Sequence, residues 1–65
     1  MKNRIKEIIS ERPGLTVAGL AKKVGITQPN MSNIVNGKTN PSLETLEKIA
    51  LALNVEIVEL FEEKS

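Results

Sequence analysis

A row of uncharged polar side chains within residues 28–36 is the feature of this sequence best suited to specific chemistry. The row consists of Gln28, Ser32, Asn33 and Asn36, with Asn30 on its flank. Exposed helix surfaces ordinarily carry charged residues. Amides and hydroxyls instead donate and accept hydrogen bonds, as the base edges in the major groove of DNA require, and Pro29 adds an apolar surface suited to a thymine methyl group. The row therefore predicts a base-reading surface, and the alternative is a merely hydrophilic helix face.

The composition excludes most kinds of catalytic and metal site. The 65 residues include no Cys, His, Trp or Tyr, and eight Glu are the only acidic side chains. Without Cys or His there is no thiolate nucleophile, disulfide, zinc site or imidazole proton shuttle. Hydrolysis by paired Glu would need two of them held in a cleft, whereas six of the eight follow residue 43 in a chain end expected to fray. We expect no enzyme, no metal and no cofactor.

The charges divide the chain into a basic part and an acidic part. Residues 1–41 carry seven Lys or Arg and two Glu, whereas residues 42–65 carry two Lys and six Glu. The net charge of +1 therefore conceals +5 in the first part and −4 in the second. This asymmetry is expected if one face approaches the phosphates of a nucleic acid. The alternative is an ordinary solvated surface that carries both signs.

Apolar residues recur at three- and four-residue steps, which predicts a set of short helices. The expected helices cover residues 3–12, 17–24, 28–36, 43–53 and 56–62. Their expected N-caps are Asn3, Thr16, Thr27 and Ser42, and their expected left-handed terminators are Gly25 and Asn54. Leu43, Leu46, Ile49, Ala50 and Leu53 form the widest apolar stripe. The expected fold is all-α, a compact five-helix bundle that forms one domain over residues 1–65.

Residues 17–36 are expected to form two helices joined by a tight turn. Ala21 is small where the two helices must cross closely, and Gly25 can adopt the positive φ that reverses the chain. Met31 and Ile34 are spaced to hold the second helix against the core. This arrangement would leave the row of amides and hydroxyls exposed to solvent.

A long motif extends from this segment over most of the chain. It comprises Leu15-Thr16, Leu20-Ala21-Lys22-Lys23-Val24-Gly25-Ile26, Thr27-Gln28, Met31-Ser32-Asn33-Ile34, Asn36-Gly37-Lys38, Pro41-Ser42-Leu43-Glu44-Thr45-Leu46 and Ile49-Ala50-Leu51-Ala52-Leu53-Asn54-Val55. In these residues the sequence resembles the Cro/phage-repressor type of helix-turn-helix domain, also called the xenobiotic-response-element family. The resemblance covers nearly all of residues 3–62. It implies a five-helix fold that binds operator DNA, usually as a dimer.

The resemblance also implies roles for individual residues. The positions that match base-reading positions of the family are Gln28, Pro29, Ser32 and Asn33. The expected phosphate contacts come from Thr16, Lys22, Thr27, Asn36 and Lys38. Val17 replaces a polar residue that many members use to grip a phosphate, so that contact is expected from Thr16, Lys22 and Lys38 instead. Glu56 replaces the usual Ser or Thr cap of the fifth helix.

The last expected helix carries more apolar side chains than one core contact requires. Ile57, Val58 and Phe61 either complete a small core or form a dimer interface, and Val35 is a second candidate for that interface. A two-fold contact there would place two copies of residues 28–36 about 34 Å apart, one turn of B-DNA, as a palindromic operator requires. We therefore expect a homodimer bound to double-stranded DNA.

These observations favour a sequence-specific transcriptional regulator, expected to be a repressor, that reads the major groove with residues 28–36. The alternative is a protein-interaction module, such as an antitoxin or a coactivator-like adaptor, that binds a protein partner through its acidic helices. No apolar run is long enough to span a membrane or to form the core of a signal peptide. A cytoplasmic location and no membrane partner are therefore expected.

Overall fold

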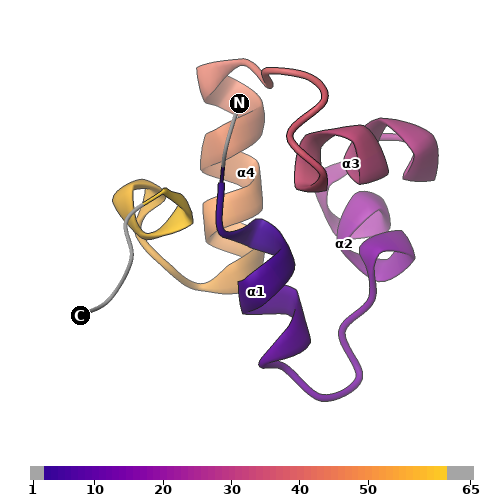
Figure 1. The fold of residues 1–65 in the computed structure, drawn as a ribbon, viewed down its shortest axis with the longest axis vertical. Helices are drawn as coiled ribbons and strands as arrows, with labels where there is room; N and C mark the ends of the chain where they lie inside the picture. The colour runs from indigo at the N-terminus through magenta and orange to yellow at the C-terminus, as the bar shows by residue number, and fades with distance from the viewer. Residues whose placement is uncertain (1–2, 62–65) are drawn as a thin grey trace.

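The fold consists of short helices connected by tight turns (Figure 1). The computed structural model describes residues 3–61. In that range the elements are α1 (Ile5–Ser10), α2 (Val17–Val24), α3 (Gln28–Val35), α4 (Leu43–Leu53) and the 3-10 helix η1 (Ile57–Leu60). The described residues include no strand, so the all-α prediction is confirmed.

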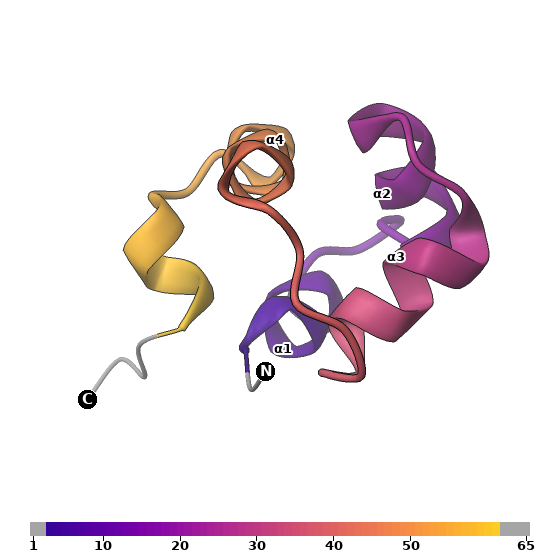
Figure 2. The same ribbon diagram turned by 90° about the horizontal axis from the view of Figure 1, so that it is seen from above.

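The helices α2 and α3 lie at one end of the molecule, and η1 lies at the other (Figure 2). The helices α1 and α4 occupy the space between these ends (Figure 2). α2 packs against both α3 and α4, and α4 packs against η1. None of the helices of residues 3–61 is long and apolar enough to cross a lipid bilayer.

Every element contributes a fully buried side chain to one core. These side chains are Ile5 from α1, Leu20 from α2, Met31 from α3, Ile49 and Leu53 from α4, and Leu60 from η1. Leu15, Val17, Ile26, Leu46, Val55 and Ile57 are partly buried against this core. A chain of this size buries little apolar surface, so each such residue matters for stability.

Local hydrogen bonds define where three of the helices begin, as the sequence predicts. The hydroxyl of Thr16 accepts from the Gly19 N–H at 3.0 Å, that of Thr27 from the Asn30 N–H at 3.3 Å, and that of Ser42 from the Thr45 N–H at 3.2 Å. Each bond satisfies a first-turn amide that has no intrahelical acceptor. The residues that end α2 and α4, Gly25 (φ +88°) and Asn54 (φ +58°), have the left-handed conformation expected of them.

The expected helix over 3–12 is shorter in the structure. Helix α1 begins at Ile5, with Arg4 rather than Asn3 in the N-cap position. The carboxamide oxygen of Asn3 nevertheless accepts from the Ile5 N–H at 2.9 Å. Beyond Ser10 the chain continues in tighter three-residue turns, including Arg12 N–H to Ile9 O at 3.1 Å, and these end the α-helix.

The prediction of a fifth α-helix over 56–62 was wrong. Residues 57–60 form a single 3-10 turn, and residue 62 lies outside the described residues. The bonds are three residues apart, from Glu59 N–H to Glu56 O (3.0 Å) and from Phe61 N–H to Val58 O (3.1 Å). The carbonyl of Leu60 accepts from the backbone N–H of Arg4 at 2.6 Å, so this carbonyl bonds the N-cap residue of α1 instead of continuing a helix.

The apolar stripe expected on α4 includes one residue, Leu43, that does not face the core. Leu43 is largely exposed, whereas Ile49, Ala50 and Leu53 are buried and Leu46 is partly buried. Leu43 is the first residue of α4, and the buried part of that helix lies in its second half. The apolar period alone could not show where along the helix the contact with the core begins.

Replacing Leu60 with Ala should lower the free energy of unfolding by about 2–5 kcal/mol, because the side chain is fully buried and its loss leaves a cavity. Urea denaturation followed by circular dichroism measures this. Leu51→Ala is the matched control, because Leu51 is 81% exposed, and its effect should stay within about 0.5 kcal/mol. If Leu60→Ala does not fold, Leu60→Met, which conserves volume, should cost less than about 1.5 kcal/mol. Equal effects of the two Ala variants would show that η1 is not part of the core.

Candidate nucleic-acid interface

Helix α3 has one face in the core and the other in solvent. Met31, Ile34 and Val35 are buried. The outer side carries Gln28, Pro29, Asn30 and Asn36, all exposed, and Ser32 and Asn33, both partly exposed. The four candidate base-reading residues, Gln28, Pro29, Ser32 and Asn33, therefore lie on one convex ridge, with Met31 and Ile34 beneath it.

The turn between α2 and α3 sets the direction of this ridge. Gly25 reverses the chain with φ +88°, and the N–H of Ile26 bonds back to the carbonyl of Ala21 at 3.0 Å. The Ile26 side chain packs against the core. Thr27 then caps α3, and Pro29 lies in its first turn, where the missing N–H costs no helical hydrogen bond. The two helices pack against each other directly.

The other end of α3 is closed by a Schellman motif. Gly37 has φ +75°, the Gly37 N–H bonds Ile34 O at 3.1 Å, and the Lys38 N–H bonds Asn33 O at 2.8 Å. This pattern satisfies carbonyls that the helix itself leaves unpaired. It also fixes the backbone of Lys38, a candidate phosphate contact, relative to that of Asn33, a candidate base-reading residue.

The polar side chains of the ridge remain available for an external partner. Gln28 and Asn33 make no side-chain hydrogen bond to any residue of the described range 3–61. Asn36 donates weakly to the hydroxyl of Ser32 at 3.4 Å. An unpaired amide in solvent keeps both donors and acceptors free for base edges.

The candidate phosphate contacts come from α2 and from the two ends of α3. Thr16, Lys22, Thr27, Asn36 and Lys38 are all exposed. The hydroxyls of Thr16 and Thr27 accept from helix amides, and each can still donate its own hydrogen to a phosphate oxygen. Lys22 lies in the last turn of α2, where a positive charge is favoured by the helix dipole. Val17, at the position that is often polar in the resembled family, is partly buried against the core and cannot bind phosphate.

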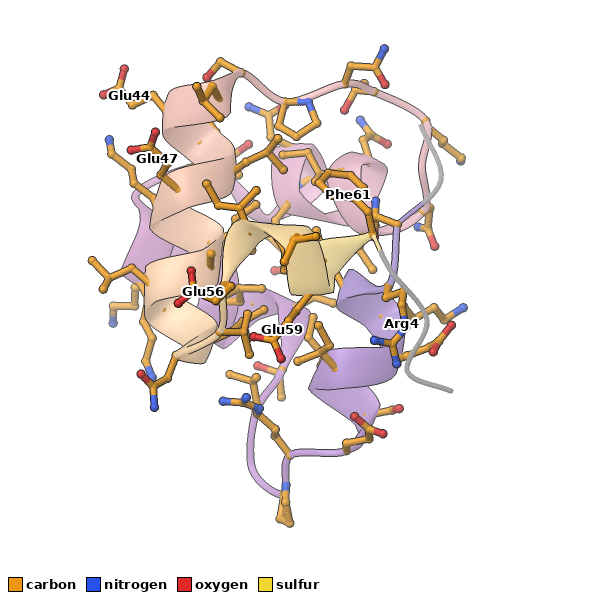
Figure 3. The ribbon with its side chains drawn as sticks, turned by 90° about the vertical axis from the view of Figure 1, so that its left-hand side faces the viewer. Arg4, Glu44, Glu47, Glu56, Glu59 and Phe61 are labelled. Carbon is orange, nitrogen blue, oxygen red and sulfur yellow. The ribbon has the colours of Figure 1, made fainter. Side chains whose placement is uncertain are left out.

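Acidic side chains gather on the side of the molecule away from α2 and α3. Glu44 and Glu47 extend from α4, and Glu56 and Glu59 from the segment that contains η1 (Figure 3). Arg4 lies on the same side and pairs with Glu7 at 3.2 Å. The four Glu of residues 42–61 thus share one side of the molecule, which also carries Arg4 and Lys48, and Lys48 pairs with Glu44 at 3.5 Å.

The candidate dimer residues differ in exposure. Val58 is 50% and Phe61 38% exposed, whereas Ile57 is partly buried and packs against the core. The suggestion that Val35 lies on the same surface was wrong, because Val35 is buried with Met31 and Ile34. Its position one residue after Ile34 places it on the inner edge of the α3 face.

Sequence analysis missed one polar contact at this site. The amide nitrogen of Asn3 donates to the carbonyl oxygen of Ile34, at the end of α3, at 2.8 Å. The two residues are 31 positions apart. No local pattern connects them, so only the folded arrangement shows the bond.

The helix-turn-helix family model matches residues 6–60, which cover most of the chain. The chain belongs to this family, in its Cro/phage-repressor type. The predicted resemblance is thus confirmed. The family consists of non-enzymatic DNA-binding transcriptional regulators, so the domain binds DNA and the expectation that it is not an enzyme is confirmed.

Several relatives of this helix-turn-helix domain support the assignment. An uncharacterized HTH-type transcriptional regulator of Archaeoglobus fulgidus is 41% identical over 61 residues, which are 94% of this chain and 86% of that protein. The HTH-type transcriptional regulator SinR of Bacillus subtilis is 39% identical over 62 residues, which are 94% of this chain and 55% of that protein. The chain covers 45% of another relative, the transcriptional regulator DdrOP3 of Deinococcus deserti. It thus spans about half the length of several curated relatives.

The fold of the domain also matches a solved structure. The crystal structure of the restriction-modification controller protein C.AhdI from Aeromonas hydrophila superimposes with a TM-score of 0.81 at 33% sequence identity. The match covers 89% of this chain and 86% of that one. The fold and the sequence therefore support the same assignment.

Proposed function

We propose that this helix-turn-helix domain is a sequence-specific repressor that inserts α3 into the major groove of double-stranded DNA. The observation that carries the proposal is the uncharged ridge of α3, which is exposed while the opposite face of the same helix is buried. An α-helix fits the major groove, where each base pair presents a distinct set of donors and acceptors. A protein bound there excludes others from the same DNA, which favours repression.

Within this proposal the ridge and its surroundings have different tasks. Gln28, Pro29, Ser32 and Asn33 contact base edges and so determine which sequence is preferred. Thr16, Lys22, Thr27, Asn36 and Lys38 contact phosphates and position the domain on the duplex, and these contacts are the same for every sequence. The Schellman bond between Lys38 N–H and Asn33 O would hold the proposed phosphate contact and the proposed base contact in a fixed relation through the backbone.

Gln28→Ala and Asn33→Ala should each weaken binding to the preferred DNA site by about 1–3 kcal/mol. Both residues are exposed or partly exposed and make no side-chain hydrogen bond to the described part of the protein, so the fold should be unchanged. The preferred site is first obtained by selection from a random DNA pool. Fluorescence anisotropy then compares that site with a scrambled duplex. A loss of equal size on both duplexes would contradict base reading.

Lys38→Ala should weaken binding to the preferred and the scrambled duplex alike, because Lys38 is assigned to phosphate. It should also reduce the slope of log K against log salt by about 1. Anisotropy titrations at several salt concentrations measure both effects. If Lys38→Ala changes the preference among sequences instead, the division of roles between the ridge and its surroundings is wrong.

We further propose that the domain binds a palindromic operator as a homodimer through the surface of Val58 and Phe61, with a smaller contribution from Ile57. The exposed apolar area on η1 supports this interface. η1 lies at the end of the molecule away from α3 (Figure 2), so a two-fold contact there leaves both α3 helices outside the interface.

Val58→Asp should raise the dissociation constant of the homodimer by tenfold or more, because it would place a charge in an apolar interface (each tenfold is about 1.4 kcal/mol). Sedimentation equilibrium measures the change. Leu51→Asp is the control, because Leu51 is also an exposed apolar residue but lies on α4, outside the proposed interface. If Leu51→Asp weakens the homodimer and Val58→Asp does not, the interface lies on α4 instead of η1.

A protein-interaction module is the second candidate function, and the acidic side of α4 and η1 favours it (Figure 3). The dependence of the binding constant on salt concentration distinguishes the two candidate functions. If Lys22 and Lys38 of each protomer neutralise phosphates, log K for DNA should fall with log salt with a slope of about −2 per protomer. Binding to a protein partner through Val58 and Phe61, the exposed apolar residues in and beside η1, should change little with salt.

A further inference from the structure

Asn3 connects the beginning of α1 to the end of α3. Its carboxamide oxygen accepts from the Ile5 N–H at 2.9 Å, and its amide nitrogen donates to the Ile34 carbonyl at 2.8 Å. One side chain thus accepts from the first amide of α1 and holds the last turn of the candidate recognition helix. The two bonds fix the orientation of the carboxamide group. Rotating this group by 180° would place its nitrogen against the Ile5 N–H and its oxygen against the Ile34 carbonyl.

The backbone around Asn3 is itself held in place. The next residue, Arg4, donates its N–H to the carbonyl of Leu60 in η1 at 2.6 Å, and Ile5 is fully buried. A side chain can position another element only if its own backbone is fixed. Asn3 meets this condition, because it is followed directly by a residue bonded to η1 and by a residue in the core.

The carbonyl that Asn3 binds is also one of the two acceptors of the Schellman motif. Ile34 O receives the Gly37 N–H at 3.1 Å in addition to the amide of Asn3. The same motif holds Lys38 to Asn33. Carbonyls at a helix C-terminus carry partial negative charge, so a second donor there is favourable. The bond therefore acts on the turn that carries a candidate base contact and a candidate phosphate contact.

We infer that Asn3 is a positioning residue for DNA recognition, which sets the C-terminal end of α3 in the groove without touching DNA itself. The inference rests on the proposed function of α3. The helix has eight residues and is about 12 Å long. Its N-terminal end is held by the Thr27 cap and the turn to α2, so losing the Asn3 bond frees mainly the other end. Base-edge hydrogen bonds tolerate only about 0.5 Å of variation in length, so a small rotation of that end weakens them.

The test uses two substitutions that keep the cap on α1 and remove the bond to α3. Asn3→Ser retains an oxygen that can accept from the Ile5 N–H, but it is too short to reach the Ile34 carbonyl. Asn3→Asp also retains the acceptor and places a carboxylate oxygen against that carbonyl. Asn40→Ser is the matched control, because Asn40 is exposed in the loop before α4 and makes no side-chain hydrogen bond to the described residues.

Two readouts separate positioning from a general loss of stability. At a temperature where circular dichroism shows all variants folded, Asn3→Ser should reduce the ratio of affinities for the selected and scrambled duplexes by about 3- to 10-fold, the value of one hydrogen bond. Native-state hydrogen exchange of the Gly37 and Lys38 amides should accelerate. Asn3→Asp should reduce the affinity ratio at least as much. Its added negative charge should also weaken binding to both duplexes by the same factor. Asn40→Ser should change neither the ratio nor the exchange.

An unchanged affinity ratio with normal exchange at Gly37 and Lys38 would overturn the inference, even if Asn3→Ser lowers the melting temperature, because Asn3 would then be only a helix cap. Failure of the proposed function looks different. In that case the unmodified protein binds the selected and scrambled duplexes equally, and the role of Asn3 in recognition is lost with it.

Discussion

The burial of Met31, Ile34 and Val35 is the interaction on which the rest of this structure depends. A helix of eight residues is not stable alone in water, because the free energy needed to form its first turn exceeds the stabilisation from its few hydrogen bonds. Packing against α2 therefore makes α3 both stable and fixed in direction. Because the buried residues occupy one face, the amides and hydroxyls of the other face must point into solvent. The candidate DNA-binding surface is thus a direct consequence of core packing.

Charge follows the same geometry. The basic candidates Lys22 and Lys38 lie near the C-terminal ends of α2 and α3, whereas Glu44, Glu47, Glu56 and Glu59 lie on the side with α4 and η1 (Figure 3). A domain with a net charge of only +1 can therefore present Lys22 and Lys38 to a polyanion while these four Glu lie away from it. In the proposed function this separation would orient the domain on approach to DNA, and the uncharged ridge would determine which bases are preferred. Orientation by charge and preference among bases can therefore depend on different residues.

The features predicted correctly from sequence are those that depend on a few neighbouring residues. Thr16, Thr27 and Ser42 cap helices because a short side chain with an oxygen can reach an amide three positions later. Gly25 and Asn54 end helices because they tolerate positive φ. Errors occurred where distant contacts compete with local ones. The carbonyl of Leu60 bonds Arg4, and the expected fifth α-helix is a 3-10 turn.

The sequence by itself thus determined the all-α class, the bounds of α2 and α4, the helix-turn-helix of residues 17–36 and the uncharged row along α3. Helical period, caps and glycine conformations are local, and they can be read from spacing alone. Only the tertiary structure decided that Val35 lies in the core, that Leu43 lies outside it, and that Asn3 bonds Ile34 across 31 positions. Such pairings depend on how the helices pack in three dimensions, and no short stretch of sequence specifies them.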